Sequence, residues 1–171
     1  GFREASGTFG LTLLEASQND VITTAVKLED GAVVAGTTAG ANSTEKPPEC
    51  GNVDLSGDGV WYEIENIAGF YKAELLLGYT DFLGQVAVYR NVDNDLICDR
   101  GSSTGSVVWL AEATQKYNVY VTGTNETAGD FDLFLGRNKD ASCTFATRVD
   151  PNSVGYLAST TFENPQNVES C

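Results

Sequence analysis

A short pattern near the start of the chain recurs near its end. Residues 1–13 read GFREASGTFGLTL and residues 123–135 read GTNETAGDFDLFL, so the pattern Gly-x-Phe-x-Leu-x-Leu matches at an offset of 122. A second match relates residues 25–50 to residues 146–171, with an offset that drifts by a residue or two. Self-similarity at a fixed period is the signature of a tandem array. The alternative is a coincidence between two ordinary strands.

The repeat predicts one whole unit between two partial ones. Residues 1–17 are expected to be the last strand of a preceding repeat, residues 18–138 a complete β-sandwich repeat, and residues 139–171 the opening strands of a following repeat. A unit of about 120 residues can bury a core of its own. On this interpretation the chain belongs to a longer protein, such as a filament, stalk or coat.

The apolar residues predict an all-β fold. Short segments rich in Val, Ile, Thr, Tyr and Phe, most of them alternating, are separated by clusters of Gly, Asn and Asp that mark turns. This pattern predicts an antiparallel β-sandwich or jelly roll of about eight strands. The expected strands are residues 21–28, 32–37, 60–65, 71–77, 85–90, 106–111, 117–122 and 131–135.

Two tryptophans lie in expected strands, where packing is favoured over binding. In residues 60–65, Trp61 faces the opposite side from Tyr62 and Ile64. One of these faces is therefore expected to anchor the core and the other to pack beneath a loop. Trp109 lies in a run so apolar that both faces of its strand are expected to be buried. The functional alternative for these rings is a platform that stacks on sugars.

The net charge argues against two classes of partner. The chain has 24 acidic and 10 basic residues, and its formal net charge is −14. Nucleic acids and anionic lipids require a basic surface, so neither is expected to bind. No apolar run approaches the roughly 20 residues of a membrane helix, and no membrane insertion is expected.

The cysteines indicate an oxidising compartment. The chain has no histidine and four widely spaced cysteines, which favours disulfides over a zinc site. These cysteines are Cys50, Cys98, Cys143 and Cys171. Four cysteines allow three pairings. The repeat favours Cys143 with Cys171, because both lie in the expected third unit, and this leaves Cys50 with Cys98.

Two glycosylation motifs agree with an extracellular or cell-surface location. Asn42 opens the motif Asn-Ser-Thr and Asn125 opens the motif Asn-Glu-Thr. Each motif lies in a polar, turn-like stretch where a glycan would be solvated. Together with disulfide-like cysteines, the two motifs favour secretion.

The chemistry of the chain favours a non-catalytic role with one candidate metal site. The absence of histidine removes the Ser-His-Asp and Cys-His arrangements and the usual catalytic zinc sites. Calcium is the one cofactor that the sequence suggests, because the alternating oxygen ligands of residues 91–95 suit it. Its candidate ligands are Asn91, Asp93, Asp95 and Asp99. Asp54 and Asp58 form a second acidic turn, and in both places the alternative is an ordinary Asx-rich turn.

The order of four motifs resembles a known family. The chain has GVWY at residues 59–62, VAVY at 86–89, YNVYVTG at 117–123 and GDFDL at 129–133. In this combination they resemble the bacterial pre-peptidase C-terminal (PPC) family of β-sandwich domains, over about residues 18–136. The resemblance implies a non-catalytic secreted accessory module, placed beside proteases or in tandem along surface proteins. The binding residues of that family are not uniform enough to be assigned to positions of this chain.

Three functions remain open at this point. The leading interpretation is a non-catalytic extracellular structural repeat of a surface or filament-forming protein, whose partners are neighbouring copies of the same repeat. The second is a carbohydrate-binding or adhesion module, in which exposed rings stack on a polysaccharide. Its first candidate rings are Tyr71, Tyr79 and Phe82. The third is an accessory domain of a secreted hydrolase, which requires a catalytic domain elsewhere in the parent protein.

Overall fold

The computed structural model describes residues 17–41, 44, 46–65, 67–76, 82–93 and 95–138. Apart from Ser17, the expected preceding repeat lies outside these residues, and so does the whole of the expected following repeat. The division of the chain into one complete and two partial repeats therefore stays a prediction.

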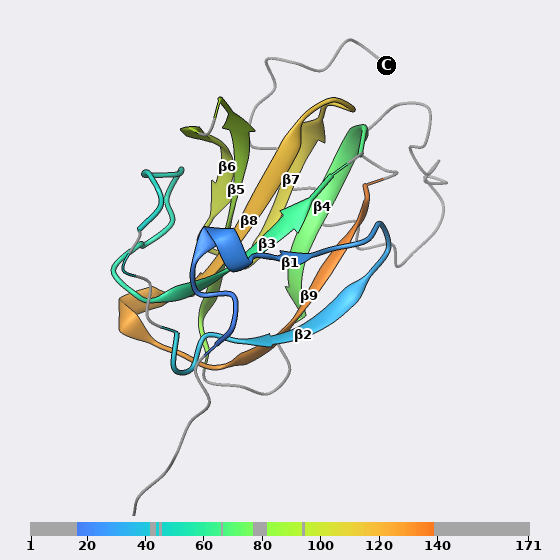
Figure 1. The fold of residues 1–171 in the computed structure, drawn as a ribbon. Helices are drawn as coiled ribbons and strands as arrows, with labels where there is room; N and C mark the ends of the chain where they lie inside the picture. The colour runs from blue at the N-terminus through green and yellow to red at the C-terminus, as the bar shows by residue number, and fades with distance from the viewer. Residues whose placement is uncertain are drawn as a thin grey trace, which may run out of the picture.

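Two β-sheets pack face to face to form the described structure (Figure 1). Sheet A has the strand order β1-β3-β8-β5-β6, and sheet B has the order β2-β9-β4-β7. The strands of sheet A are β1 (Val26–Lys27), β3 (Gly59–Ile64), β8 (Lys116–Gly123), β5 (Gly84–Val92) and β6 (Asp95–Ser102). The strands of sheet B are β2 (Val33–Thr37), β9 (Asp130–Arg137), β4 (Gly69–Leu76) and β7 (Ser106–Ala111). Two short 3-10 helices are η1 (Ile22–Thr24) and η2 (Thr124–Glu126).

The strand pairing is that of a jelly roll. Strand β2 pairs with β9, β3 with β8, β4 with β7 and β5 with β6, all antiparallel, so the chain forms one long hairpin rolled into a sandwich. The β4–β9 and β5–β8 pairs then join the layers of the roll into two sheets. The predicted all-β sandwich or jelly roll is confirmed. One pair departs from the antiparallel pattern, because β1 runs parallel to β3 at the edge of sheet A.

The eight expected strands are all present, with two differences. Residues 21–28 contain only the two-residue strand β1, because η1 occupies residues 22–24. Strand β6 is missing from the sequence prediction, since Asp95, Asp99, Arg100 and Gly101 give it the composition of a turn. Strand β6 lies at the edge of sheet A, where charged residues discourage pairing with another chain.

The main core lies between the two sheets. The inward-facing residues of β9 are Phe131, Leu133 and Leu135, and none is more than 5% exposed. The Gly-x-Phe-x-Leu-x-Leu pattern thus forms a strand whose apolar positions all face the core, as the alternation predicts. Tyr62 and Ile64 of β3 belong to the same core.

Trp109 of β7 also packs in the main core, where it is 3% exposed. This confirms the predicted packing role of its ring. The expectation that both faces of its strand are buried is wrong, because Leu110 is 59% exposed on the outer face of sheet B. An apolar run of this kind cannot distinguish a strand buried on both faces from one that presents an apolar outer face.

The first and the last parts of the described chain both lie near β2. Ser17 lines the same cavity as Thr37, where β2 ends. Arg137 ends β9, and its Nε lies 3.6 Å from the carboxylate of Asp30, just before β2 begins. The cavity beside Ser17 also includes Val34, so it extends along most of β2 (Val33–Thr37).

Candidate functional site

A second, smaller core lies on the outer face of sheet A. Trp61, Tyr89 and Tyr120 meet there, and none of them is more than 1% exposed. The ring centroid of Trp61 lies 4.6 Å from that of Tyr120 and 5.9 Å from that of Tyr89. Rings at these separations attract one another beyond the effect of their buried area. Sheet A is therefore buried on both of its faces over this region.

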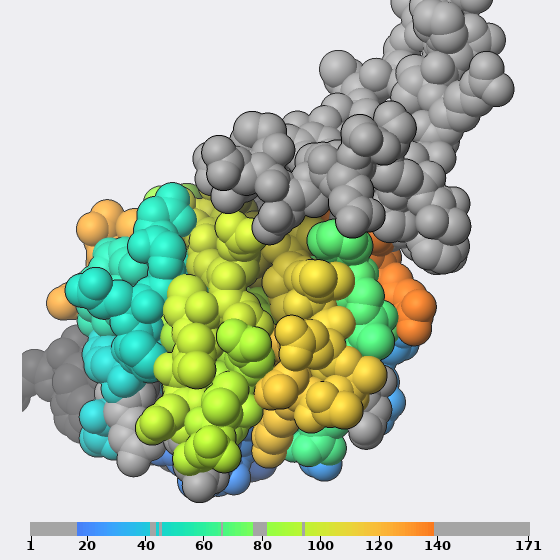
Figure 2. All heavy atoms as spheres, turned by 90° about the horizontal axis from the view of Figure 1, so that it is seen from above, coloured from blue at the N-terminus to red at the C-terminus, as the bar shows by residue number. Residues whose placement is uncertain are grey.

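Residues 46–58, the cover segment, form the lid of this second core. The segment contributes Cys50, Val53 and Leu55 to the cluster around Trp61. Figure 2 shows it in cyan, packed along the yellow-green strands β5 and β6. The alternation of residues 60–65 thus has the predicted result, because Tyr62 faces the main core and Trp61 packs beneath a loop.

A disulfide ties the cover segment to the edge of sheet A. Cys50 is bonded to Cys98 of β6, with 5.3 Å between their Cα atoms. This confirms the pairing that the repeat favours for these two cysteines, whereas Cys143 and Cys171 lie outside the described residues. Gly101 permits the close crossing, because a Cβ there would collide with the carbonyl oxygen of Cys50.

Buried polar groups hold the cover segment at two further points. Tyr89 donates its hydroxyl to the carbonyl oxygen of Pro48 at 2.8 Å, and burial raises the pKa of this phenol. Gln85 is 1% exposed, and its Oε1 accepts from the backbone N–H of Asp54 at 2.9 Å. A buried amide that loses its partner costs about 1–3 kcal/mol, so Gln85 requires the segment in this position.

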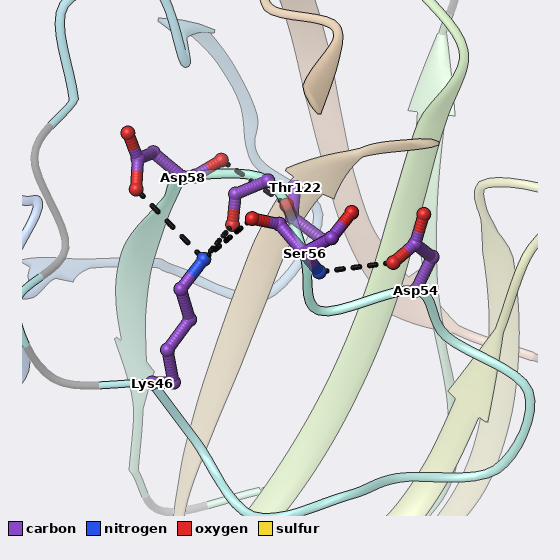
Figure 3. Close-up of polar contacts among 6 residues, drawn as sticks. Lys46, Asp54, Ser56, Asp58 and Thr122 are labelled. Atoms are coloured by element: carbon purple, nitrogen blue, oxygen red, sulfur yellow. Dashed lines mark hydrogen bonds and ion pairs between the residues drawn. The ribbon is translucent and has the colours of Figure 1, made fainter. Parts of the chain in front are cut away.

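The end of the cover segment is organised around a lysine (Figure 3). The Nζ of Lys46 donates to the carbonyl oxygens of Ser56 at 2.8 Å and Gly57 at 2.6 Å. It also lies 3.9 Å from the carboxylate of Asp58, whose own carbonyl oxygen accepts from the Thr122 hydroxyl at 3.1 Å. Of the two carboxylates in the second acidic turn, that of Asp58 thus lies beside an ammonium group of the chain itself.

We expect Lys46→Met to loosen this end of the cover segment. The substitution keeps most of the side-chain length but leaves two carbonyl oxygens without their charged donor. Hydrogen bonds to a charged group are worth about 1.5–3 kcal/mol, and solvent screening at a side chain that is 40% exposed reduces this to about 1 kcal/mol. Urea unfolding should show that loss. A smaller change is expected for Lys27→Met, at a lysine that is 69% exposed, and an equal change would contradict the assignment.

The carboxylate of Asp54 joins the cover segment to η2. It accepts from the backbone N–H of Asn125 and from that of Ser56, both at 2.9 Å. These two hydrogen bonds lower the pKa of Asp54, and the one from Asn125 has the larger effect. A group whose pKa is lowered on folding stabilises the fold above its unfolded pKa of about 4, and this contribution disappears as the pH falls through the folded pKa.

Asp54→Asn should therefore give a pH-dependent loss of stability. At pH 7 the variant is expected to unfold at a lower urea concentration than the wild type, because the charged acceptor is gone. As the pH falls below about 4, the wild-type carboxyl becomes protonated and the two midpoints should converge. A gap between the midpoints that is the same at neutral and acid pH would contradict this role for Asp54.

All four candidate calcium ligands lie on the β5–β6 hairpin, and three of them lie at or next to its turn. Asn91 lies near the end of β5, Asp93 adopts a positive φ of 53° in the turn, and Asp95 begins β6. Asp93 and Asp95 are exposed. The sequence thus correctly predicts a turn here, with the three residues on or beside it.

Asp99, the fourth candidate, interacts with an arginine instead. It lies at a bulge, since Val88 pairs with Arg100 and Tyr89 with Cys98, and its carboxylate is 3.5 Å from the Nε of Arg90. Burial raises the pKa of Asp99, and the charge of Arg90 opposes this. Within the described part of the chain, no group of three or more Asp, Glu, His or Cys residues is placed to hold a metal ion. Calcium binding stays a prediction.

Of the two glycosylation candidates, one can be placed. Asn125 is exposed in η2, where its φ and ψ are 51° and 45°. The hydroxyl of Thr127, the last residue of its motif, donates to the carbonyl oxygen of Thr124 at 2.8 Å. Asn42 lies outside the described residues. Glycosylation of both residues stays a prediction.

The structure does not support Tyr71 and Phe82 as rings that stack on a polysaccharide. Tyr71 is 1% exposed and donates its hydroxyl to Asp30 at 3.0 Å. Phe82 is 3% exposed and stacks on Phe131, with 5.9 Å between the ring centroids. Both predictions are wrong because these rings belong to the main core, while Tyr79 lies outside the described residues.

Two cavities lie beside the sandwich, and their linings carry few ionisable side chains. One of about 400 Å³ opens between the edges of the two sheets, and Tyr62 is its only ionisable lining residue among those described. The other, of about 440 Å³, lies next to the cover segment and includes Asp58 and Glu126.

Comparison with known proteins yields similarity of fold alone. No family model matches the sequence, and no curated protein matches it. Among solved structures, the chain is similar to the pre-peptidase C-terminal domain of collagenase from Bacillus anthracis. The two share 12% identity with a TM-score of 0.42, and the match covers 65% of this chain and 93% of that one. The matched domain is of the family that the sequence motifs resemble, but a likeness this distant carries no argument about function.

The described residues contain no helix that is both long and apolar enough to cross a bilayer.

Proposed function

We propose that the sandwich is a non-catalytic extracellular structural module, one unit of a tandem-repeat surface or filament-forming protein. The observation that carries this proposal is the position of the entry and exit points. Ser17 lines a cavity beside residues 34–37 of β2, whereas Arg137 lies beside Asp30, just before β2 begins. Entry and exit at different places along the sandwich are compatible with units joined in series.

The second core supports a structural role over a binding role. The aromatic face of sheet A, the surface that a sugar-binding module would display, is covered by residues 46–58 and closed by the Cys50–Cys98 disulfide. A disulfide of this kind suits an oxidising, extracellular compartment. The absence of histidine from the chain and the sparsely ionisable cavities support a module without catalysis.

The test is the full reading frame of the parent protein, followed by removal of one unit from it. The proposal expects several units of about 120 residues in series. Deletion of one such unit should shorten the particle seen by electron microscopy and leave the other parts of the protein functional. A single unit beside a catalytic domain would contradict the array and favour an accessory domain of a secreted hydrolase.

A further inference from the structure

The outer face of sheet B carries large apolar side chains from three strands. Val33 of β2 is 54% exposed, Phe70 and Leu76 of β4 are 38% and 44% exposed, and Leu110 of β7 is 59% exposed. The register places Phe70 directly beside Leu110, so their side chains share this face. Monomeric proteins seldom expose a contiguous apolar patch of this kind without a use for it. The outer face of sheet A, by contrast, is covered by residues 46–58.

One pair of opposite charges lies in the middle of this apolar face. The Nζ of Lys72 is 2.7 Å from the carboxylate of Glu74, and both side chains are 33% exposed. The register places Lys72 beside Val108 and Glu74 beside Phe134. The face is therefore an apolar surface with one positive and one negative group two residues apart on β4, and exposed Asp132 of β9 lies beside Leu76 at its margin.

We propose that this face binds the same face of a second copy of the sandwich. The path of the chain favours such a partner, because the backbone N–H of Asn138 donates to the carbonyl oxygen of Phe70 at 2.9 Å. The chain therefore leaves the sandwich at the rim of this face, and a following unit would be held close to it at high effective concentration. The inference rests on the proposed function, since a neighbouring repeat supplies the second copy.

The face is complementary to itself about a two-fold axis. Consider a two-fold axis that lies in the plane of the interface, runs perpendicular to β4 and crosses it midway between Lys72 and Glu74. This axis places β4 of the second copy directly opposite β4 of the first, running antiparallel to it. Lys72 then faces Glu74 of the second copy, and Phe70 faces Leu76 of the second copy. A two-fold contact uses the same patch twice in this way. Lys72 and Glu74 of each copy then meet opposite charges, which avoids leaving either of them unpaired at the centre of the interface.

Ionic strength should affect this association in a definite direction. The formal net charge of −14 makes two copies repel each other at low salt. Salt screens that long-range repulsion, whereas the contact between apolar side chains remains. The dimer should therefore become more populated as the salt concentration rises, opposite to the behaviour of an association driven by surface charge.

Sedimentation equilibrium of the full chain tests the proposal. The wild type is expected to form a reversible dimer whose fraction rises with protein and salt concentration. Leu76→Glu should weaken dimerisation by about tenfold or more, because it places an unpaired charge in the contact. Ile97→Glu is the matched control, since Ile97 is 43% exposed on β6 of sheet A and should leave the dimer unchanged.

A charge-reversal pair makes the test specific to the two-fold arrangement. Lys72→Glu alone and Glu74→Lys alone each place like charges opposite one another, so each variant should be monomeric. Their equimolar mixture should form a dimer, because every like-charge contact becomes an opposite-charge contact. A wild-type chain that stays monomeric at about 1 mM would overturn the proposal. So would dimerisation of either single variant at the wild-type level, or a mixture that stays monomeric.

The outcomes separate this inference from the proposed function. A parent protein with repeated units, together with a monomeric wild-type chain, refutes the shared face and leaves the serial module in place. A parent protein with a single unit beside a catalytic domain refutes the serial module, and sedimentation then decides separately whether the face binds a second copy.

Discussion

Replacing both Cys50 and Cys98 by alanine is expected to lower the free energy of unfolding of the sandwich by about 4 kcal/mol. The disulfide joins residues that are 48 positions apart, and a crosslink of that span removes much of the conformational entropy of the unfolded chain. The folded state loses as well, because the cover segment then rests on its polar contacts and on the packing of Val53 and Leu55. Urea unfolding of the double variant and the wild type measures the difference.

The matched control for this prediction is the variant Cys143→Ala with Cys171→Ala. These residues belong to the predicted following repeat, so removing them should leave the unfolding transition of the sandwich unchanged. A loss of less than about 1 kcal/mol for the Cys50 and Cys98 double variant would contradict the role of this disulfide as the main constraint on the cover segment.

Trp61→Ala is expected to destabilise the sandwich by about 3–5 kcal/mol, the usual range for a buried tryptophan. Trp61 is 1% exposed and packs against Tyr89 and Tyr120, and the chain between Lys46 and Asp58 covers it. The substitution therefore leaves a cavity between sheet A and the cover segment. Thermal or urea unfolding measures the loss.

The comparison that interprets this result is Trp109→Ala. Trp109 is 3% exposed in the main core between the sheets, so its replacement should cost a similar amount. Losses of similar size show that the outer face of sheet A is covered by a true second core. A loss of less than about 1 kcal/mol at Trp61, beside a large loss at Trp109, would show a loosely covered surface instead.

The parts of the fold that the sequence predicts well are those with strong alternation. Strand β9 is an example, because Phe131, Leu133 and Leu135 occupy every second position and all face the main core. Strand β6 is missed because an edge strand can carry charges and a glycine without losing its pairing on one side. Periodicity therefore identifies central strands better than it identifies edges.

The candidate site is only partly visible in the sequence, because it depends on which loop covers which face. The alternation of residues 60–65 predicts that Trp61 lies beneath a loop, and the cysteine pattern favours the pair Cys50 and Cys98. Neither observation places residues 46–58 over Tyr89 and Tyr120, since that placement depends on tertiary contacts such as the Gln85 amide. The sequence did contain a signal for a second core. Tyr89 lies on the opposite face of β5 from Val88, and Tyr120 lies on the opposite face of β8 from Val121.

Burial explains why two aromatic candidates were wrong, and a bulge explains where Asp99 lies. Tyr71 and Phe82 have ring types that often bind sugars, but their positions in the sandwich bury them. Asp99 follows the acidic turn closely in sequence, yet a bulge in β6 places its carboxylate beside Arg90. A bulge shifts every later position by one residue, and no local pattern in this strand announces it.

Hydrogen exchange at the indole N–H of Trp61 tests most directly whether the aromatic face of sheet A is a sealed core and not a binding surface. This nitrogen is buried, and no hydrogen-bond partner for it is found among the described residues, so only burial protects it from solvent. We expect its exchange, followed by NMR, to require global unfolding, with a protection free energy equal to that of the β3 and β8 amides. Rapid exchange at this site while those amides stay protected would show that residues 46–58 open readily, and would contradict the structural account.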